Sequence, residues 1–131
     1  MEKKEKLSIG IVGAGEIATS VHIPLLSCFN NINIKYVADI KTPEVPIKTE
    51  RIKIENPATL PECDILLLTT PVGVRERYIQ EFGARKAYIF TEKPFAIDTE
   101  MHKRLLNSSG KITANYIRIY YSSIQQIKEI I

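Results

Sequence analysis

A glycine-rich turn near the start of the chain contains the residues best suited to ligand chemistry. It has the spacing Gly13-x-Gly15-x-x-Ala18 and follows an apolar run over residues 7–12. Gly13 permits a tight turn, and Gly15 lets backbone approach a phosphate because it has no side chain. Ala18 is small enough for a helix to pack closely on a strand. The spacing therefore predicts a turn whose backbone N–H groups face the diphosphate of a dinucleotide.

An acidic residue further along the chain favours this interpretation over a plain strand-to-helix turn, which remains the alternative. Asp39 follows Gly15 by 24 residues, close to the roughly 20 expected for a carboxylate that binds ribose hydroxyls. Glu16 argues the other way, because its side chain would repel a phosphate if it pointed inward. The predicted diphosphate contacts are Gly13, Ala14, Gly15, Glu16 and Ile17.

Short apolar runs alternate with helical patterns along the rest of the chain. The predicted strands cover residues 7–12, 33–38, 51–54, 64–69, 87–91 and 112–119. The alternation indicates an α/β fold with a doubly wound, mostly parallel sheet of the Rossmann type in a single domain. We expect a charged tail at 1–6, the dinucleotide-binding domain at 7–119, and at 120–131 a C-terminal helix that starts a second domain absent from this chain.

The predicted connections between strands differ in kind. A helix begins near Glu16, and Pro24 should kink it or start a fresh helix near Ile23. Two prolines exclude a regular helix between residues 41 and 48, so an extended strap is predicted there. Further helices are predicted at 74–82 with Gly83 as the C-terminal cap, at 99–107 with Asp98 or Thr99 as the N-terminal cap, and at 122–131.

Polar residues follow two of the predicted buried strands. Thr70 and Pro71 follow the run at 64–69, and Glu92-Lys93-Pro94 follows the run at 87–91. Ligands of an open parallel sheet bind outside the carboxyl ends of its strands. These residues are therefore candidates for the same site as the glycine turn.

Taken together, these segments resemble the Gfo/Idh/MocA oxidoreductase family. The resemblance rests on GAGEIA at 13–18, HIPLL at 22–26, VAD at 37–39, DILLLTTP at 64–71 and EKP at 92–94, in an order and spacing that span nearly the whole chain. It implies an NAD(P)-dependent enzyme acting on sugars, inositols or related polyols. It also implies a Rossmann domain followed by a C-terminal α/β domain.

For the cofactor, the resemblance implies roles for individual residues. The glycine turn would hold the diphosphate. Asp39 would bind the adenosine ribose and favour NAD over NADP by repelling a 2′-phosphate, and Lys41 would soften that preference. Thr70 and Pro71 would lie along the cofactor.

At the reacting end, the resemblance implies that Glu92 and Lys93 approach the nicotinamide. Lys93 would be the catalytic residue, placing positive charge beside the developing alkoxide or carbonyl oxygen. The Lys93-Pro94 bond is often cis in this family. Asn115 and Arg118 would contact the small-molecule substrate, with strand-edge solvation as the alternative for both. His22 is interpreted as a structural residue at the helix bend.

The chain also departs from the family pattern. Arg75 stands where members commonly carry a histidine, and the proline strap replaces a helix. The chain ends at Ile131, before the segment that would carry the family's acid–histidine catalytic pair, as expected for a truncated chain.

Our primary hypothesis is the NAD(P)-binding domain of an oxidoreductase that transfers hydride to or from a sugar- or polyol-like substrate. The alternative is a nucleotide-binding or scaffold domain without hydride transfer. A third option, an S-adenosylmethionine site, is disfavoured because a methyltransferase would not need the segment Glu92-Lys93-Pro94.

The composition limits the partners further. Lys and Arg number 18 against 15 Asp and Glu, and they are interspersed, so a nucleic-acid face is not expected. No apolar run approaches membrane-spanning length. Cys28 and Cys63 lack metal-ligand or CxxC spacing, which indicates reduced thiols in a cytoplasmic protein and no metal site. The sequence leaves a homo-oligomer open.

Overall fold

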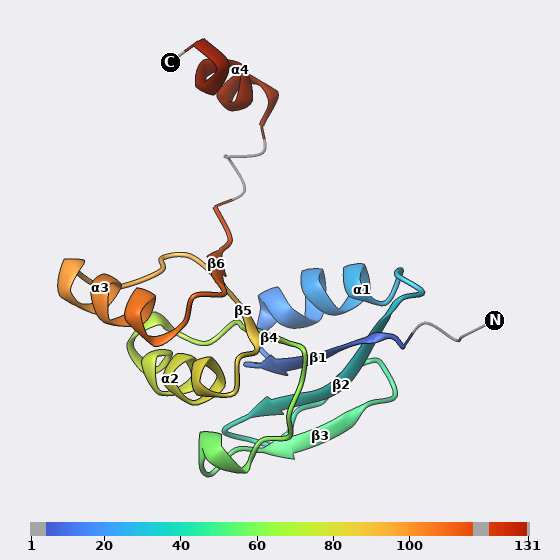
Figure 1. The fold of residues 1–131 in the computed structure, drawn as a ribbon. Helices are drawn as coiled ribbons and strands as arrows, with labels where there is room; N and C mark the ends of the chain where they lie inside the picture. Colours follow the sequence, from blue (N-terminus) through green and yellow to red (C-terminus); the bar gives the residue numbers. More distant parts are fainter. Residues whose placement is uncertain (1–4, 117–120, 131) are drawn as a thin grey trace.

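A computed structural model of the 131-residue chain describes residues 5–116 and 121–130. Within them, six parallel strands form one sheet in the order β3-β2-β1-β4-β5-β6 (Figure 1). The strands are β1 (Leu7–Val12), β2 (Ile32–Asp39), β3 (Glu50–Lys53), β4 (Ile65–Leu68), β5 (Tyr88–Thr91) and β6 (Ile112–Ala114). The strand order reverses between β1 and β4, where such sheets bind their ligands. The predicted doubly wound parallel fold is confirmed.

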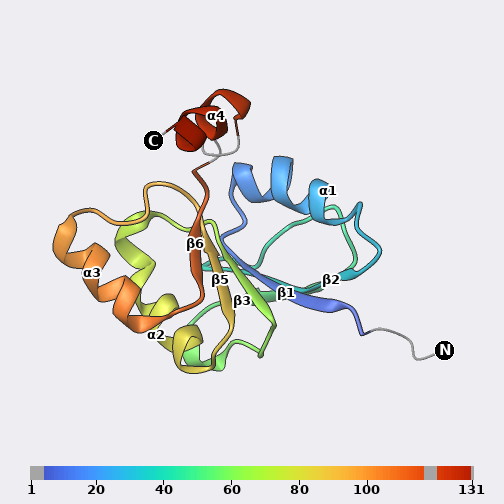
Figure 2. The ribbon, with the colours of Figure 1, turned by 45° about the horizontal axis from the view of Figure 1, so that its top comes forward.

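Helices cover both faces of this sheet (Figure 1, Figure 2). Residues 16–26 are helical throughout, with a π-helical segment η1 (Ala18–His22) that passes into α1 (Ile23–Leu26). The other face carries α2 (Glu76–Ala84) and α3 (Thr99–Ser108). The remaining elements are the 3₁₀ turns η2 (Pro57–Thr59) and η3 (Val72–Val74), and the helix α4 (Ser122–Ile130).

The helix after β1 behaves as its proline predicts. Pro24 lies in the first turn of α1 and directly follows the widened π-helical turn of η1, so the irregular turn falls where the proline lacks an N–H donor. The side chain of Ala18 is fully buried against the sheet. A small residue at this point lets the helix start close to β1, as the glycine-turn spacing predicts.

Side chains that alternate along the strands feed two separate cores. Leu66 and Leu68 of β4 point to the face covered by α2 and α3, where Phe82 and Leu105 meet them. Leu67 points to the opposite face. This alternation explains why β4 reads as a continuous apolar run, since both of its faces are buried.

An extended strap joins β2 to β3, as the two prolines predict. No helix forms over residues 41–49, all of which the structure describes. Val45 lies in the same core as Leu67 and is only 7% exposed. The strap thus covers part of the sheet face that a crossover helix would otherwise cover.

Two predictions about helix α2 need correction. The helix begins at Glu76 rather than Val74, because η3 occupies the residues before it. Gly83 is not the cap: the helix continues to Ala84, and the left-handed residue is Lys86, with φ of 61°. A Cβ at Gly83 would lie 2.2 Å from the carbonyl oxygen of Ser108. The glycine is therefore required by the close packing of α2 on the end of α3.

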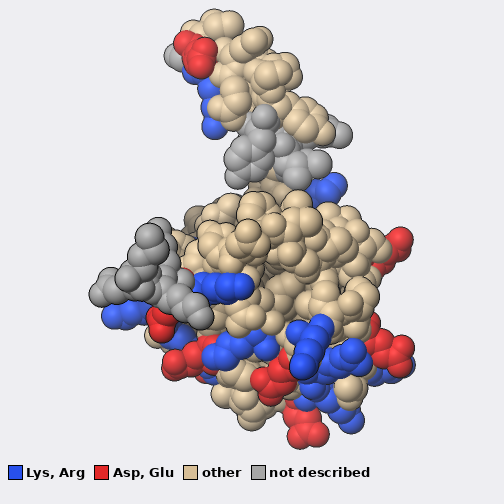
Figure 3. Space-filling view, turned by 90° about the vertical axis from the view of Figure 1, so that its right-hand side faces the viewer, with Lys and Arg blue, Asp and Glu red and all other residues tan. Residues whose placement is uncertain are grey.

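The last predicted strand is shorter than expected. β6 ends at Ala114 rather than continuing to residue 119, and residues 117–120 lie outside those described. The Asp98 side chain caps α3 as predicted, accepting a hydrogen bond from the Met101 amide at 2.8 Å. No helix among the described residues is long and apolar enough to span a bilayer. On the face shown in Figure 3, cationic and anionic side chains intermingle in the lower half.

Candidate functional site

The carboxyl ends of the central strands border a cleft of about 730 Å³. Its walls come from the glycine turn after β1, the ends of β2 and β4, η3 with the start of α2, and residues 92–94 after β5. A second hollow, of about 780 Å³, lies at the opposite edge near Lys35 and Lys111. We assign the site to the carboxyl edge, because parallel sheets bind ligands there and the predicted residues converge on it.

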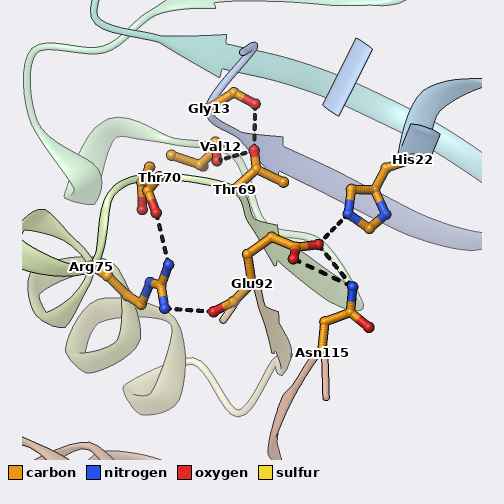
Figure 4. A network of polar contacts seen from close by, with 8 residues as sticks. All are labelled: Val12, Gly13, His22, Thr69, Thr70, Arg75, Glu92 and Asn115. Atoms are coloured by element: carbon orange, nitrogen blue, oxygen red, sulfur yellow. Dashed lines mark hydrogen bonds and ion pairs between the residues drawn. The ribbon is translucent and has the colours of Figure 1, made fainter. Parts of the chain in front are cut away.

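The glycine turn is fixed to its neighbouring strands by hydrogen bonds. Gly13 has a φ of 101°, and its amide donates to the Ala38 carbonyl at 2.8 Å. The Thr69 hydroxyl lies 2.6 Å from the Gly13 carbonyl oxygen and 3.1 Å from that of Val12 (Figure 4). A Cβ at Gly13 would meet Thr69 at 2.7 Å, so both the backbone angle and the close packing require glycine. The turn is thereby held in one conformation.

Gly15 differs from Gly13 because it faces open space. It is exposed, and a Cβ there would have no heavy atom within 4 Å. The amides of Gly15, Glu16 and Ile17 have no hydrogen-bond acceptor among the residues that the structure describes. Unpaired N–H groups at the start of a helix are a ready anion site. This opening is what the approach of a diphosphate requires.

The Asp39 carboxylate accepts a hydrogen bond from the Ala14 amide, which precedes these three amides in the chain. Its Oδ2 accepts a hydrogen bond from the Ala14 amide, and its Oδ1 accepts one from the Ile40 amide, both at 2.7 Å. The Ala14 amide is therefore engaged within the protein, and its predicted contact with a diphosphate stays a prediction. The carboxylate itself lines the cleft at the end of β2.

Arg75 joins the two loops on the other side of the cleft. Its Nη2 donates to the Thr70 carbonyl at 2.8 Å, and its Nη1 donates to the Glu92 carbonyl at 2.7 Å (Figure 4). The same Nη1 donates to the Pro94 carbonyl. Only 1% of the residue is exposed. Burial lowers the pKa of the guanidinium from its usual value. Arg75 therefore places a buried cation beneath the loop that carries Lys93.

Glu92 is held by two residues from distant parts of the chain. Its Oε1 lies 2.5 Å from His22 Nε2, and the Asn115 amide nitrogen lies 3.1 Å and 3.3 Å from its two carboxylate oxygens (Figure 4). The side chains of His22 and Glu92 are 12% and 14% exposed. Sequence reasoning missed this network. His22 and Glu92 are 70 residues apart, and only the folded helix after β1 brings the imidazole to the end of β5.

The remaining predicted residues fall on or near the same cleft. Thr70, Pro71 and Lys93 line it. Lys93 is exposed, and its ammonium has no hydrogen bond or ion pair with the described residues. The Lys93–Pro94 bond is cis. Arg118 lies outside the described residues, and no group of three or more His, Cys, Asp or Glu in the described parts could hold a metal ion.

Comparison with known proteins agrees with this geometry. Residues 7–117 match a sequence model described as an oxidoreductase family with an NAD-binding Rossmann fold. No curated protein sequence matches the chain at a significant level.

Three solved structures illustrate the structural likeness. They are a 3-ketoreductase from Actinomadura kijaniata in complex with TDP-benzene and NADP, the WlbA dehydrogenase from Bordetella pertussis in complex with NADH and UDP-GlcNAcA, and scyllo-inositol dehydrogenase from Lactobacillus casei with NAD(H) and scyllo-inositol. Their TM-scores are 0.77, 0.79 and 0.77 at 14%, 18% and 16% identity. The matches cover 96%, 95% and 96% of this chain, but only 43%, 41% and 41% of those chains. The shared fold is therefore that of one part of longer proteins.

Proposed function

Since the chain belongs to the Gfo/Idh/MocA family of oxidoreductases, whose Rossmann fold binds NAD, we propose that its carboxyl-edge cleft binds NAD(H) or NADP(H) for hydride transfer to or from a sugar- or polyol-like substrate. The observation that carries this proposal is the exposed run of unpaired amides at Gly15, Glu16 and Ile17. Gly15 and Ile17 line the cleft, which Asp39 and Lys93 also line.

The residues present fit a dinucleotide. A Cβ on Gly15 would have no heavy atom within 4 Å, so no side chain blocks the approach of a phosphate at that point, and the unpaired amides would supply donors for it. Asp39, at the end of β2, would accept hydrogen bonds from the adenosine ribose. The nicotinamide half would then extend toward β4 and β5, where Thr70, Pro71 and Lys93 line the cleft.

We infer a preference for NAD over NADP from the position of Asp39. A carboxylate beside the ribose repels a 2′-phosphate, because two negative charges would meet in a partly buried site. Lys41 lies two residues further on and would weaken the repulsion. The three structures named above were solved with NADP, NADH and NAD(H), so they support either cofactor for this fold.

The catalytic role proposed for this chain rests on Lys93. The nicotinamide ring, when bound, would accept or donate the hydride. The Lys93 ammonium has no partner among the described residues and lines the cleft, so it can place positive charge beside a substrate oxygen that becomes an alkoxide. Arg75 holds the carbonyl groups on both sides of Lys93, which fixes the corner that carries this charge.

The substrate class is inferred from the family and from what the structural neighbours bind. One of those structures contains scyllo-inositol and another contains a nucleotide sugar. The second candidate function is a nucleotide-binding domain that does not transfer hydride. Arg75 favours it, since the family commonly carries a histidine at this position and the arginine here bonds only to backbone carbonyls.

Thermal unfolding with and without nucleotides tests the binding proposal. A ligand at 100 times its Kd should add about 2.7 kcal/mol to the free energy of unfolding. We expect NAD(H) to stabilise the chain, NADP(H) to stabilise it less, and S-adenosylmethionine to have no effect. No stabilisation by any dinucleotide would overturn the proposal. Binding without turnover of any polyol, in a form of the protein that contains a complete substrate site, would favour the second candidate.

A further inference from the structure

Arg75 is a buried cation that no carboxylate contacts in the described part of the chain. Its three hydrogen-bond acceptors are backbone carbonyls, and its Nε has no partner. The carboxylate of Glu92 is held by His22 and Asn115, while only the Glu92 carbonyl bonds to the arginine (Figure 4). Carbonyl dipoles stabilise a guanidinium but do not cancel its charge. The wall of the cleft therefore carries a positive charge that lacks a direct ionic partner.

This charge lies at one particular end of the site. Arg75 bonds to the loops that follow β4 and β5, whereas Asp39 stands at the end of β2, across the switch point. Lys93 lies between the two carbonyls that Nη1 contacts and adds a second positive charge. A dinucleotide whose adenosine ribose meets Asp39 would have its nicotinamide at the end of the site that carries these cations.

The two redox forms of the cofactor differ in charge at the nicotinamide ring. The ring of NAD⁺ carries a positive charge that the ring of NADH lacks, while the diphosphate and adenosine are the same in both. A fixed cation near the ring therefore disfavours the oxidised form alone. At an effective dielectric constant of about 20, a unit charge within about 10 Å changes an equilibrium by roughly tenfold.

We propose that Arg75 is a specificity-determining residue for the redox state of the ligand, so that this chain binds NADH more tightly than NAD⁺. The inference rests on the proposed dinucleotide site. Glu92 is the carboxylate that opposes the effect at this end of the cleft. Its single negative charge offsets that of Lys93, so the charge of Arg75 remains in excess there. Because Arg75 is buried, salt screens its charge much less than it screens an exposed lysine.

Calorimetric titration of the 131-residue chain with NADH and with NAD⁺ separately tests the proposal. The quantity of interest is the ratio of the two dissociation constants, Kd for NAD⁺ over Kd for NADH. Four forms are compared: the wild type, Arg75→Met without the charge, Arg75→Lys with the charge but without the planar fork, and Lys103→Met as a control. Lys103 is a cation on α3, its side chain is 65% exposed, and it does not line the cleft.

We expect a ratio of about five or more for the wild type and the control, falling toward about one in Arg75→Met. Arg75→Lys should keep most of the wild-type ratio, because the charge remains. A purely structural role would weaken both ligands equally and leave the ratio unchanged. A wild-type ratio near one with both ligands bound would overturn the inference even if Arg75→Met failed to fold, while leaving the proposed function intact. Failure to bind either form would instead overturn the proposed function, and this inference with it.

Discussion

The Asp39 carboxylate accepts a hydrogen bond from the Ala14 amide at 2.7 Å, which joins the end of β2 to the glycine turn after β1. The same carboxylate accepts a hydrogen bond from the Ile40 amide. Asp39 therefore fixes the shape of the turn and also presents negative charge to the cleft. Its structural and ligand-binding roles should be separable by experiment.

Replacing Asp39 with alanine removes the acceptor for both amides. We expect a loss of about 1–3 kcal/mol in the free energy of unfolding, because two backbone donors lose their partner. The same change should raise the affinity for NADP relative to NAD, since the repulsion of a 2′-phosphate is gone. Urea unfolding and nucleotide titration measure the two effects. Glu55→Ala, at an exposed acid, is the control, and an unchanged NADP-to-NAD ratio in Asp39→Ala would contradict the assignment.

Gly13 and Gly15 should respond differently to substitution. Gly13→Ala forces an L side chain into a φ of 101° and against Thr69, so it should destabilise the fold by about 1–3 kcal/mol. Gly15→Val meets open space in the protein, so the melting temperature should hardly change while dinucleotide binding is lost. Thermal melts and titrations of both variants check this pair. Equal dinucleotide affinity of Gly15→Val and the wild type would show that the glycine turn does not bind the dinucleotide.

Gly83→Ala should destabilise the protein even though alanine is the better helix former. Helix propensity alone would favour alanine by about 1 kcal/mol, but the new Cβ would lie 2.2 Å from the Ser108 carbonyl oxygen. We expect a lower melting temperature than the wild type. Gly73→Ala is the matched control, because a Cβ there has no neighbour within 4 Å. A more stable Gly83→Ala variant would mean that α2 and α3 lie further apart than described.

Stability should fall at alkaline pH because of a half-buried thiol, Cys63, and a buried phenol, Tyr36. Burial raises the pKa of Cys63 and of Tyr36, whose hydroxyl lies 3.7 Å from the Cys63 sulfur. Above about pH 8.5 the thiol of the unfolded chain ionises while the folded one keeps its proton, so stability is lost at up to about 1.4 kcal/mol per pH unit. Below that pH the contribution is fully present. Urea unfolding from pH 7 to 10 should show this decline in the wild type and a flatter profile in Cys63→Ala; equal slopes would contradict it.

Much of the fold was predictable because its signals are local. The apolar runs gave the strands, Pro24 gave the start of α1 at Ile23, and the paired prolines gave the strap. The mistaken cap at Gly83 shows the limit of this reasoning. A glycine near a helix end indicates a cap when only the local sequence is considered, but here it is required by Ser108, which is distant in the sequence.

The site was predictable in its position and less so in its contacts. Glycine spacing and strand ends located the cleft, because in a parallel sheet the carboxyl ends of the strands meet along one edge. The contact of His22 with Glu92 and the three carbonyls held by Arg75 join segments that no short-range pattern connects. Those contacts depend on how complete loops pack together, and no motif or residue spacing in the sequence indicates that packing.

Amide NMR of the ¹⁵N-labelled chain titrated with NADH tests the central claim most directly, because it reports on the N–H groups that the claim concerns. We predict that the largest shifts occur at Gly15, Glu16 and Ile17, with smaller ones at Asp39 and Thr70, and none at Lys35 or Lys111 on the opposite edge of the sheet. Shifts confined to that opposite edge, or no change in the glycine turn at millimolar NADH, would contradict it.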